Sequence, residues 1–181
     1  MDEPLVDMLA GGHRNSLGRT EEVVELVVKD RLRLGELFAC LKSSDGVVRM
    51  RAGDALEKVC RGRAAWFVQY ADALLGEIAR LDQPSVQWHT AQMLQHLRPH
   101  LTDEQRPLAI GLLESYLSQS NDWIVLNVSM GVLADWARSD SALARRLVAQ
   151  LERLRTDPRK SVAKRASKCL GTLAVKSDLG V

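Results

Sequence analysis

The 181-residue chain has little of what disulfide-rich, membrane-spanning or metal-dependent proteins rely on. Its three cysteines, Cys40, Cys60 and Cys169, are odd in number and widely spaced, so neither a disulfide framework nor a CxxC metal motif is expected. No apolar run approaches the roughly 20 residues that a membrane helix needs. The acidic start, residues 1–4, lacks the apolar segment of a secretion signal. We therefore expect a reduced, cytoplasmic protein that does not enter a membrane.

Sequence motifs of common catalytic sites are also missing. The chain contains no G-x-S-x-G turn, no phosphate-binding glycine loop and no H-E-x-x-H motif. His96 and His100 have the spacing of helical metal ligands, but Pro99 interrupts the helix there and no carboxylate shares the spacing. We expect a protein that is not an enzyme, with no catalytic residue, no cofactor and no metal ion.

The chain does contain one helical pattern that is repeated four times. A valine opens each copy and a leucine follows eight positions later: Val48 with Leu56, Val86 with Leu94, Val125 with Leu133, and Val162 with Leu170. The four leucines lie 38, 39 and 37 residues apart. A period of this length, without glycine- or proline-rich spacers, indicates an array of stacked helical repeats.

The residues between the valine and the leucine support the same interpretation. The position four residues after each valine (+4) is small: Ala52, Thr90, Ser129 and Ala166. A small side chain on the apolar stripe of a helix lets a neighbouring helix approach closely. Amphipathic stretches at residues 30–41, 64–81, 102–117 and 142–154 precede the four copies, and residues 20–28 form another. Thr102 and Gln105 have the spacing of a helix capping box.

The best-defined copy, residues 45–56, has the pattern Asp-x-x-Val-Arg-x-x-Ala-x-x-Ala-Leu, with Val48 and Arg49 as its Val-Arg pair. This pattern resembles HEAT repeats, and the resemblance covers residues 30 to 175. It implies an all-α fold, a right-handed α-solenoid of about four HEAT-like (armadillo-like) repeats plus an N-terminal helix. In that family the arginine helps to link adjacent repeats, whereas Gln87, Leu126 and Ala163 replace it in the later copies. Family members range from scaffold proteins to a few enzymes.

The expected organisation has three parts. Residues 1–19 are expected to be a loosely ordered lead-in, residues 20–176 a single solenoid domain, and residues 177–181 a tail. The resemblance also implies that the second helix of each repeat lines a concave face. By helical geometry, the positions two and six residues after each valine (+2 and +6) should point away from the core.

These positions, with one neighbouring histidine, are the predicted partner-binding residues: Met50, Asp54, Trp88, His89, Gln92, Asn127, Lys164 and Lys168. Trp88 has two interpretations, a binding hot spot if it is exposed and an inter-repeat filler if the helix is rotated. Trp66, Trp123 and Trp136 lie on or near core stripes and are expected to pack. The most direct function is a scaffold that binds a protein or peptide in the concave groove.

The charge distribution supports an alternative. Residues 1–30 carry a net charge of −4, whereas residues 140–181 carry +6. A basic end attracts nucleic acid, an acidic protein or the acidic end of another copy, although charge of this kind also serves simply as a solvated face. Arg159, Lys160 and Arg165 would form a basic patch with Lys164 and Lys168. HEAT-like DNA glycosylases need an aspartate and aromatic residues on the concave face, for which Asp54 and Trp88 are the nearest candidates.

Overall fold

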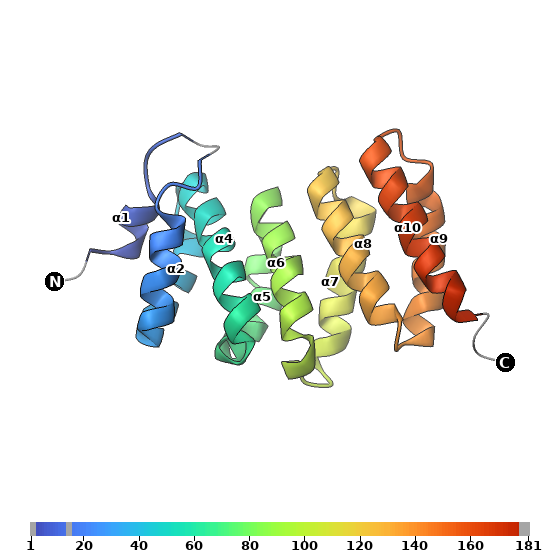
Figure 1. Ribbon diagram of the computed structural model, residues 1–181, viewed down its shortest axis with the longest axis horizontal. Coiled ribbons are helices and arrows are strands. Elements are labelled where there is room, and N and C mark those ends of the chain that lie inside the picture. Colours follow the sequence, from blue (N-terminus) through green and yellow to red (C-terminus); the bar gives the residue numbers. More distant parts are fainter. Residues whose placement is uncertain (1–2, 14–15, 178–181) are drawn as a thin grey trace. The chain divides into compact units, whose positions relative to one another are not determined.

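The computed structural model describes residues 3–13 and 16–177, with side chains up to residue 174. Every regular element in those ranges is a helix, which confirms the all-α prediction (Figure 1). The chain forms two compact units, Met1–Gln105 and Arg106–Val181, and each is described by itself. No helix in the described ranges has the length and apolar character to cross a membrane.

The first unit contains α1 to α6, joined partly by short 3-10 helices. The α-helices are α1 (Leu5–Leu9), α2 (Thr20–Lys29), α3 (Leu34–Ala39), α4 (Gly46–Arg63), α5 (Ala71–Leu75) and α6 (Pro84–Leu97), and the 3-10 helices are Arg31–Arg33, Cys40–Lys42, Ala64–Tyr70, Ile78–Arg80 and Arg98–His100. The helices expected at 30–41 and 64–81 are therefore broken into short pieces. Residues 64–70 are rich in aromatic side chains, which lose rotamer freedom in an α-helix, and Gly76 caps the end of α5.

The second unit contains four uninterrupted helices. They are α7 (Gln105–Gln119), α8 (Trp123–Ala137), α9 (Ser141–Arg155) and α10 (Lys160–Ser177). The predicted capping box opens α7, because Thr102 and Gln105 each accept a hydrogen bond from the other's backbone N–H, at 3.1 and 3.2 Å. Asp122 caps α8 by accepting from the amides of Ile124 and Val125. Of the tail expected at residues 177–181, only Ser177, the last residue of α10, lies within the described ranges.

The 38-residue period corresponds to parallel packing of α4 and α6 in the first unit. Near the start of both helices, the Gln83 amide donates to the carbonyl oxygen of Gly46 at 2.9 Å. Near their ends, the Cys60 thiol lies 3.9 Å from the carbonyl oxygen of Met93. The two contacts join residues 37 and 33 positions apart in the same order along both helices. The two helices therefore run side by side in the same direction (Figure 1).

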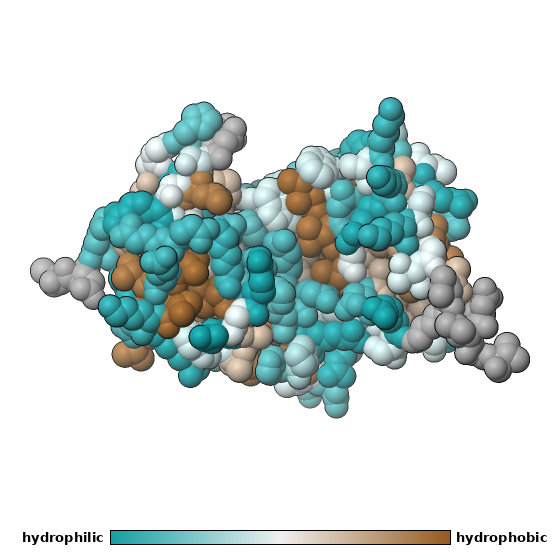
Figure 2. Space-filling view, in the orientation of Figure 1, coloured by the Kyte–Doolittle hydropathy of each residue, from teal (hydrophilic) through white to brown (hydrophobic). Residues whose placement is uncertain are grey.

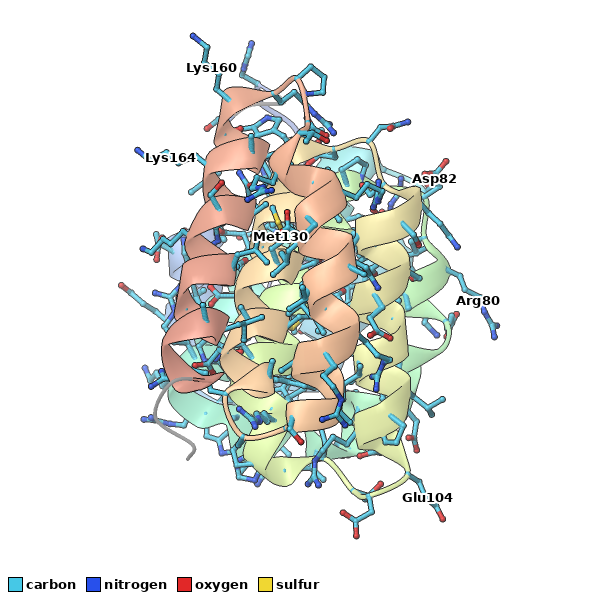
Figure 3. All side chains as sticks on the ribbon, turned by 90° about the vertical axis from the view of Figure 1, so that its right-hand side faces the viewer. Arg80, Asp82, Glu104, Met130, Lys160 and Lys164 are labelled. Atoms are coloured by element: carbon cyan, nitrogen blue, oxygen red, sulfur yellow. The ribbon has the colours of Figure 1, made fainter. Side chains whose placement is uncertain are left out.

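The same relationship holds between α8 and α10 in the second unit. Arg165 Nε donates to the carbonyl oxygen of Asn127 at 3.3 Å, and the Cys169 thiol lies 3.7 Å from that of Met130. These pairs are 38 and 39 residues apart. Met130 is fully buried in the interior of this unit (Figure 3). Within each unit, one sequence period is thus one step from a helix to its parallel neighbour.

The predicted core positions are confirmed. All four valines and three of the four leucines are at most 1% exposed, and Leu170 is half-buried. The four small +4 residues, Ala52, Thr90, Ser129 and Ala166, are completely buried. Burying this stripe removes apolar surface from water, which contributes about 25 cal/mol per Å² to the stability of each unit.

The amino-terminal segment differs from the loosely ordered lead-in expected there. Residues 5–9 form α1, and Leu5 and Leu9 are completely buried. The guanidinium of Arg51, 1% exposed, donates to the carbonyl oxygens of Leu9 and Gly11 at 2.7 Å each and to that of Ser16 at 2.9 Å. Apolar burial and this set of hydrogen bonds together hold residues 5–13 and 16–18 onto α4.

Candidate functional site

Three of the predicted binding residues meet in the first unit, where α4 and α6 lie side by side. Asp54 Oδ1 is 3.7 Å from His89 Nε2, and the ring centroids of His89 and Trp88 are 5.5 Å apart. Asp54 Oδ2 forms an ion pair of 2.8 Å with Lys58, which also pairs with Glu21 of α2. This group of charged side chains, Glu21, Asp54, Lys58 and His89, is called the α4–α6 cluster below.

Within the α4–α6 cluster, Asp54 and Lys58 stabilise each other's charged forms. Burial by itself raises the pKa of Asp54, but His89 and Lys58 outweigh burial and hold that pKa below its usual value. Burial likewise lowers the pKa of Lys58, and Asp54 and Glu21 outweigh it, so the pKa is raised. Both groups are therefore charged at neutral pH. The ion pairs of Lys58 with Asp54 and Glu21 hold these charges in place within the first unit.

Trp88, Met50 and Gln92 are all partly exposed. Trp88 is therefore neither the freely exposed platform nor the fully buried filler of the two sequence interpretations. His89 is only 8% exposed, and its Nδ1 has no hydrogen-bond partner. Its ring packs on the backbone of α4, where a Cβ at Gly53 would lie 2.9 Å from Nδ1. His89 thus closes the contact between the helices, and Trp88 and Gln92 form the accessible part of the surface.

Lys164 and Lys168 are exposed, as expected for +2 and +6 positions, whereas Asp54 and Asn127 are half-buried against a neighbouring helix. The residue three positions after the valine (+3) of the next helix reaches back and covers them. His89 covers Gly53 and Asp54 in the first unit, and Arg165 covers Asn127 and Gly131 in the second. Asn127 is half-buried as a result. The rotation of α4 and α8 thus places Asp54 and Asn127 at the border with the neighbouring helix.

The sequence analysis did not predict a second group of charged side chains, which lies between α4 and α6. Glu57 is 4% exposed, accepts from Arg61 Nη2 at 2.6 Å and lies 3.2 Å from His96 Nε2. A buried carboxylate needs such partners, because an unpaired one is strongly destabilising. The spacing of Glu57 and Arg61, four residues apart on one helix, was the available signal. His96, considered above as a metal ligand, thus has a carboxylate partner on the neighbouring helix.

Only some residues of the predicted basic patch are exposed to solvent. Arg159 is bound to both carboxylate oxygens of Asp157 and donates to the carbonyl oxygen of Asn121. Arg165 is half-buried against α8. These two guanidinium groups join neighbouring elements of the unit and do not face solvent freely. Lys160, Lys164 and Lys168 are exposed, and Lys160 and Lys164 project from α10 (Figure 3).

The other three tryptophans were all expected to pack in the core, but they differ in burial. Trp136 is 1% exposed and packs in the core as predicted. Trp66 is half-buried, with the guanidinium groups of Arg31 and Arg63 at 5.5 and 5.7 Å from its ring. Trp123 was expected to pack but is 51% exposed, because as the first residue of α8 it precedes the buried stripe that Val125 begins.

Within the described ranges, no three His, Cys, Asp or Glu side chains gather closely enough to hold a metal ion. Cys40, Cys60 and Cys169 are buried free thiols, and burial raises the pKa of each. No protein-family model, curated protein or solved structure matches the chain. Its function must therefore be inferred from its own residues.

Proposed function

We propose that the chain is a non-enzymatic binding module built as a HEAT-like α-solenoid, and that it recognises a protein or peptide partner. The 38-residue period and the parallel packing of helices one period apart in each unit support the repeat assignment. Repeat proteins of this architecture present extended surfaces on equivalent helices, and such surfaces serve recognition more often than chemistry.

The observation that carries this proposal is the surface of α4 and α6 around Trp88. A partly exposed tryptophan beside the polar side chain of Gln92, over charges already fixed by ion pairs, has the composition of an interface hot spot. Because the Asp54 and Lys58 charges are paired within the protein, a partner need not neutralise them on binding. Trp88 is the apolar anchor of the interface, and Gln92 is a hydrogen-bonding contact beside it.

Nucleic-acid binding is the second candidate function, and one observation favours it. Lys160, Lys164 and Lys168 are exposed at intervals of four residues, so they form one basic stripe along α10. With Arg159 and Arg165 engaged inside the unit, these three lysines are the members of the predicted basic patch that can contact phosphates. Three contacts correspond to a slope of about −2.7 for log K against log salt concentration. The glycosylase alternative loses support, because Asp54 is half-buried and ion-paired.

An affinity capture with matched variants tests the main proposal. Wild-type protein, Trp88→Ala and Trp123→Ala are immobilised at equal density, and the proteins captured from a native lysate are quantified. We expect at least one protein to be captured by the wild type and by Trp123→Ala but reduced at least tenfold with Trp88→Ala. Equal capture by the two variants would refute a role for Trp88. Loss of all capture after nuclease treatment would favour nucleic-acid binding instead.

A further inference from the structure

An apolar groove lies between α9 and α10 and encloses about 600 Å³. Val148, which is 39% exposed, Leu170 and Ala174 contribute apolar surface to it, and Gly171 lies in its wall. A second hollow of about 450 Å³ shares Ala144, Arg145 and Leu173 with the first, so the depression continues along the two helices. This depression is called the α9–α10 groove below.

Comparison with α4 shows what the α9–α10 groove corresponds to in the repeat. Three buried positions of α4, at +5, +9 and +12 from its valine, contact the next helix. Gly53 meets His89, Glu57 meets His96, and the Cys60 thiol lies near the Met93 carbonyl. The equivalent residues of α8 are Met130, Ala134 and Ala137, which are at most 5% exposed.

The equivalent residues of α10 are Ser167, Gly171 and Ala174, and all three are exposed and line the groove. A Cβ at Gly171 would have no atom within 4 Å. A glycine inside a helix costs about 1 kcal/mol relative to alanine, and no contact with the described residues requires one here. The α9–α10 groove therefore exposes the positions that contact the next helix in α4, and it has the character of a stacking surface.

Charge indicates the kind of partner that fits. Arg145 and Arg155 border the groove, and Arg155 is paired with Glu152 while Arg145 has no ion-pair partner among the described residues. The complementary surface occurs at the other end of the same sequence. Glu25 and Val28 are exposed on α2, and Leu32, just beyond it, is 89% exposed. These three residues are called the α2 surface below. Hydrophobic surface over α2 is visible in Figure 2.

We propose that the α9–α10 groove of one copy binds the α2 surface of a second copy, so that the chain associates head to tail. Val28 and Leu32 of the second copy enter the apolar groove, and Glu25 lies near Arg145 at its edge. Such an interface is heterologous: each copy contributes a different surface, and each keeps one free end. The proposal concerns other residues than those around Trp88 and does not depend on the proposed function.

Two variants block one surface each without disturbing the unit that carries it. Gly171→Glu places a carboxylate in the groove at a position with open space around it. Leu32→Lys replaces an 89% exposed leucine of the α2 surface. Leu108→Lys is the matched control, since Leu108 is 61% exposed on α7 and lines neither surface. Circular dichroism and thermal unfolding establish that all three variants are folded.

Sedimentation velocity over a concentration series, up to the order of 100 μM, measures association. Wild-type protein and Leu108→Lys should grow in apparent mass with concentration, and less so at high salt. Gly171→Glu and Leu32→Lys should each remain monomeric, but an equimolar mixture of the two should form a 1:1 dimer and nothing larger. A monomeric wild type, an unaffected Leu32→Lys variant, or a mixture that does not dimerise would each overturn the proposal.

Discussion

The side chain of His89 in α6 packs directly on Gly53 of α4, because its Nδ1 lies 2.9 Å from the point where a Cβ on residue 53 would stand. The Cβ and Cγ of His89 would each lie 3.4 Å from the same point. The near side of the ring and the base of the His89 side chain therefore occupy the space above Gly53. The close contact of these two helices depends on the absence of a side chain at position 53.

Gly53→Ala should destabilise the protein by about 1–3 kcal/mol, because the added methyl group displaces a packed ring. Gly62→Ala is the matched control in the same helix, where a Cβ would have no neighbour within 4 Å. That variant should stabilise the helix by about 0.5–1 kcal/mol. Urea unfolding measures both changes. Stabilisation by Gly53→Ala would show that the contact is not tight.

Replacing Arg51 should release the amino-terminal segment. Arg51→Met leaves several buried carbonyl oxygens without a donor, at a cost on the order of 3 kcal/mol. Hydrogen exchange of residues 5–13 should then accelerate much more than that of α6. Arg63→Met, at an exposed position at the end of α4, is the control and should change neither quantity appreciably. Unchanged exchange in α1 after loss of Arg51 would contradict this role.

The three thiols should react slowly while the protein is folded. Burial raises the pKa of Cys60 to about 12 and that of Cys40 to about 11, and it also raises the pKa of Cys169. At pH 8 all three are protonated and covered, so a disulfide reagent should label fewer than one thiol per chain within minutes. Three thiols should be labelled in denaturant. Rapid labelling of one thiol in the native protein would contradict this description of its surroundings.

Acid should remove the stabilisation that Asp157 provides. The hydrogen bonds from Arg159 lower the pKa of Asp157 from 3.8 to about 2. A lowered pKa in the folded state stabilises the protein above pH 4, and this contribution is lost as the pH falls from about 4 towards 2. Asp157→Asn should therefore be less stable than the wild type at pH 7 and nearly equal to it at pH 2. Urea midpoints at the two pH values test this, and a constant difference would contradict it.

The sequence predicted the buried stripe well because that stripe repeats. Val48 and Leu56 recur with one spacing, and only a packed helix face requires such regularity. The breaks at residues 64–70 and at Gly76 were not predicted, because hydrophobic periodicity continues through a 3-10 turn. The packing of α1 was missed for another reason. Its five residues are too few for a periodic pattern, and Arg51 stabilises the segment from 35 or more residues away in the sequence.

The candidate site was predicted less well than the fold. A rotation of one residue about a helix axis, about 100°, decides whether Asn127 faces solvent or a neighbouring helix. The sequence does not determine that rotation. The four copies do carry a usable signal, since the +3 residues are Arg51, His89, Val128 and Arg165. Three of these are basic, and each of the three reaches back to preceding parts of its own unit.

Site-directed photo-crosslinking tests the central claim, that a protein partner binds the surface of α4 and α6 around Trp88. A benzophenone amino acid replaces Gln92, beside Trp88, or Leu108, an exposed control position on α7. After irradiation in a native lysate, we predict a discrete protein adduct from position 92 that is absent from position 108 and lost when Trp88→Ala is added. No adduct at position 92, or one that Trp88→Ala leaves unchanged, would contradict the claim.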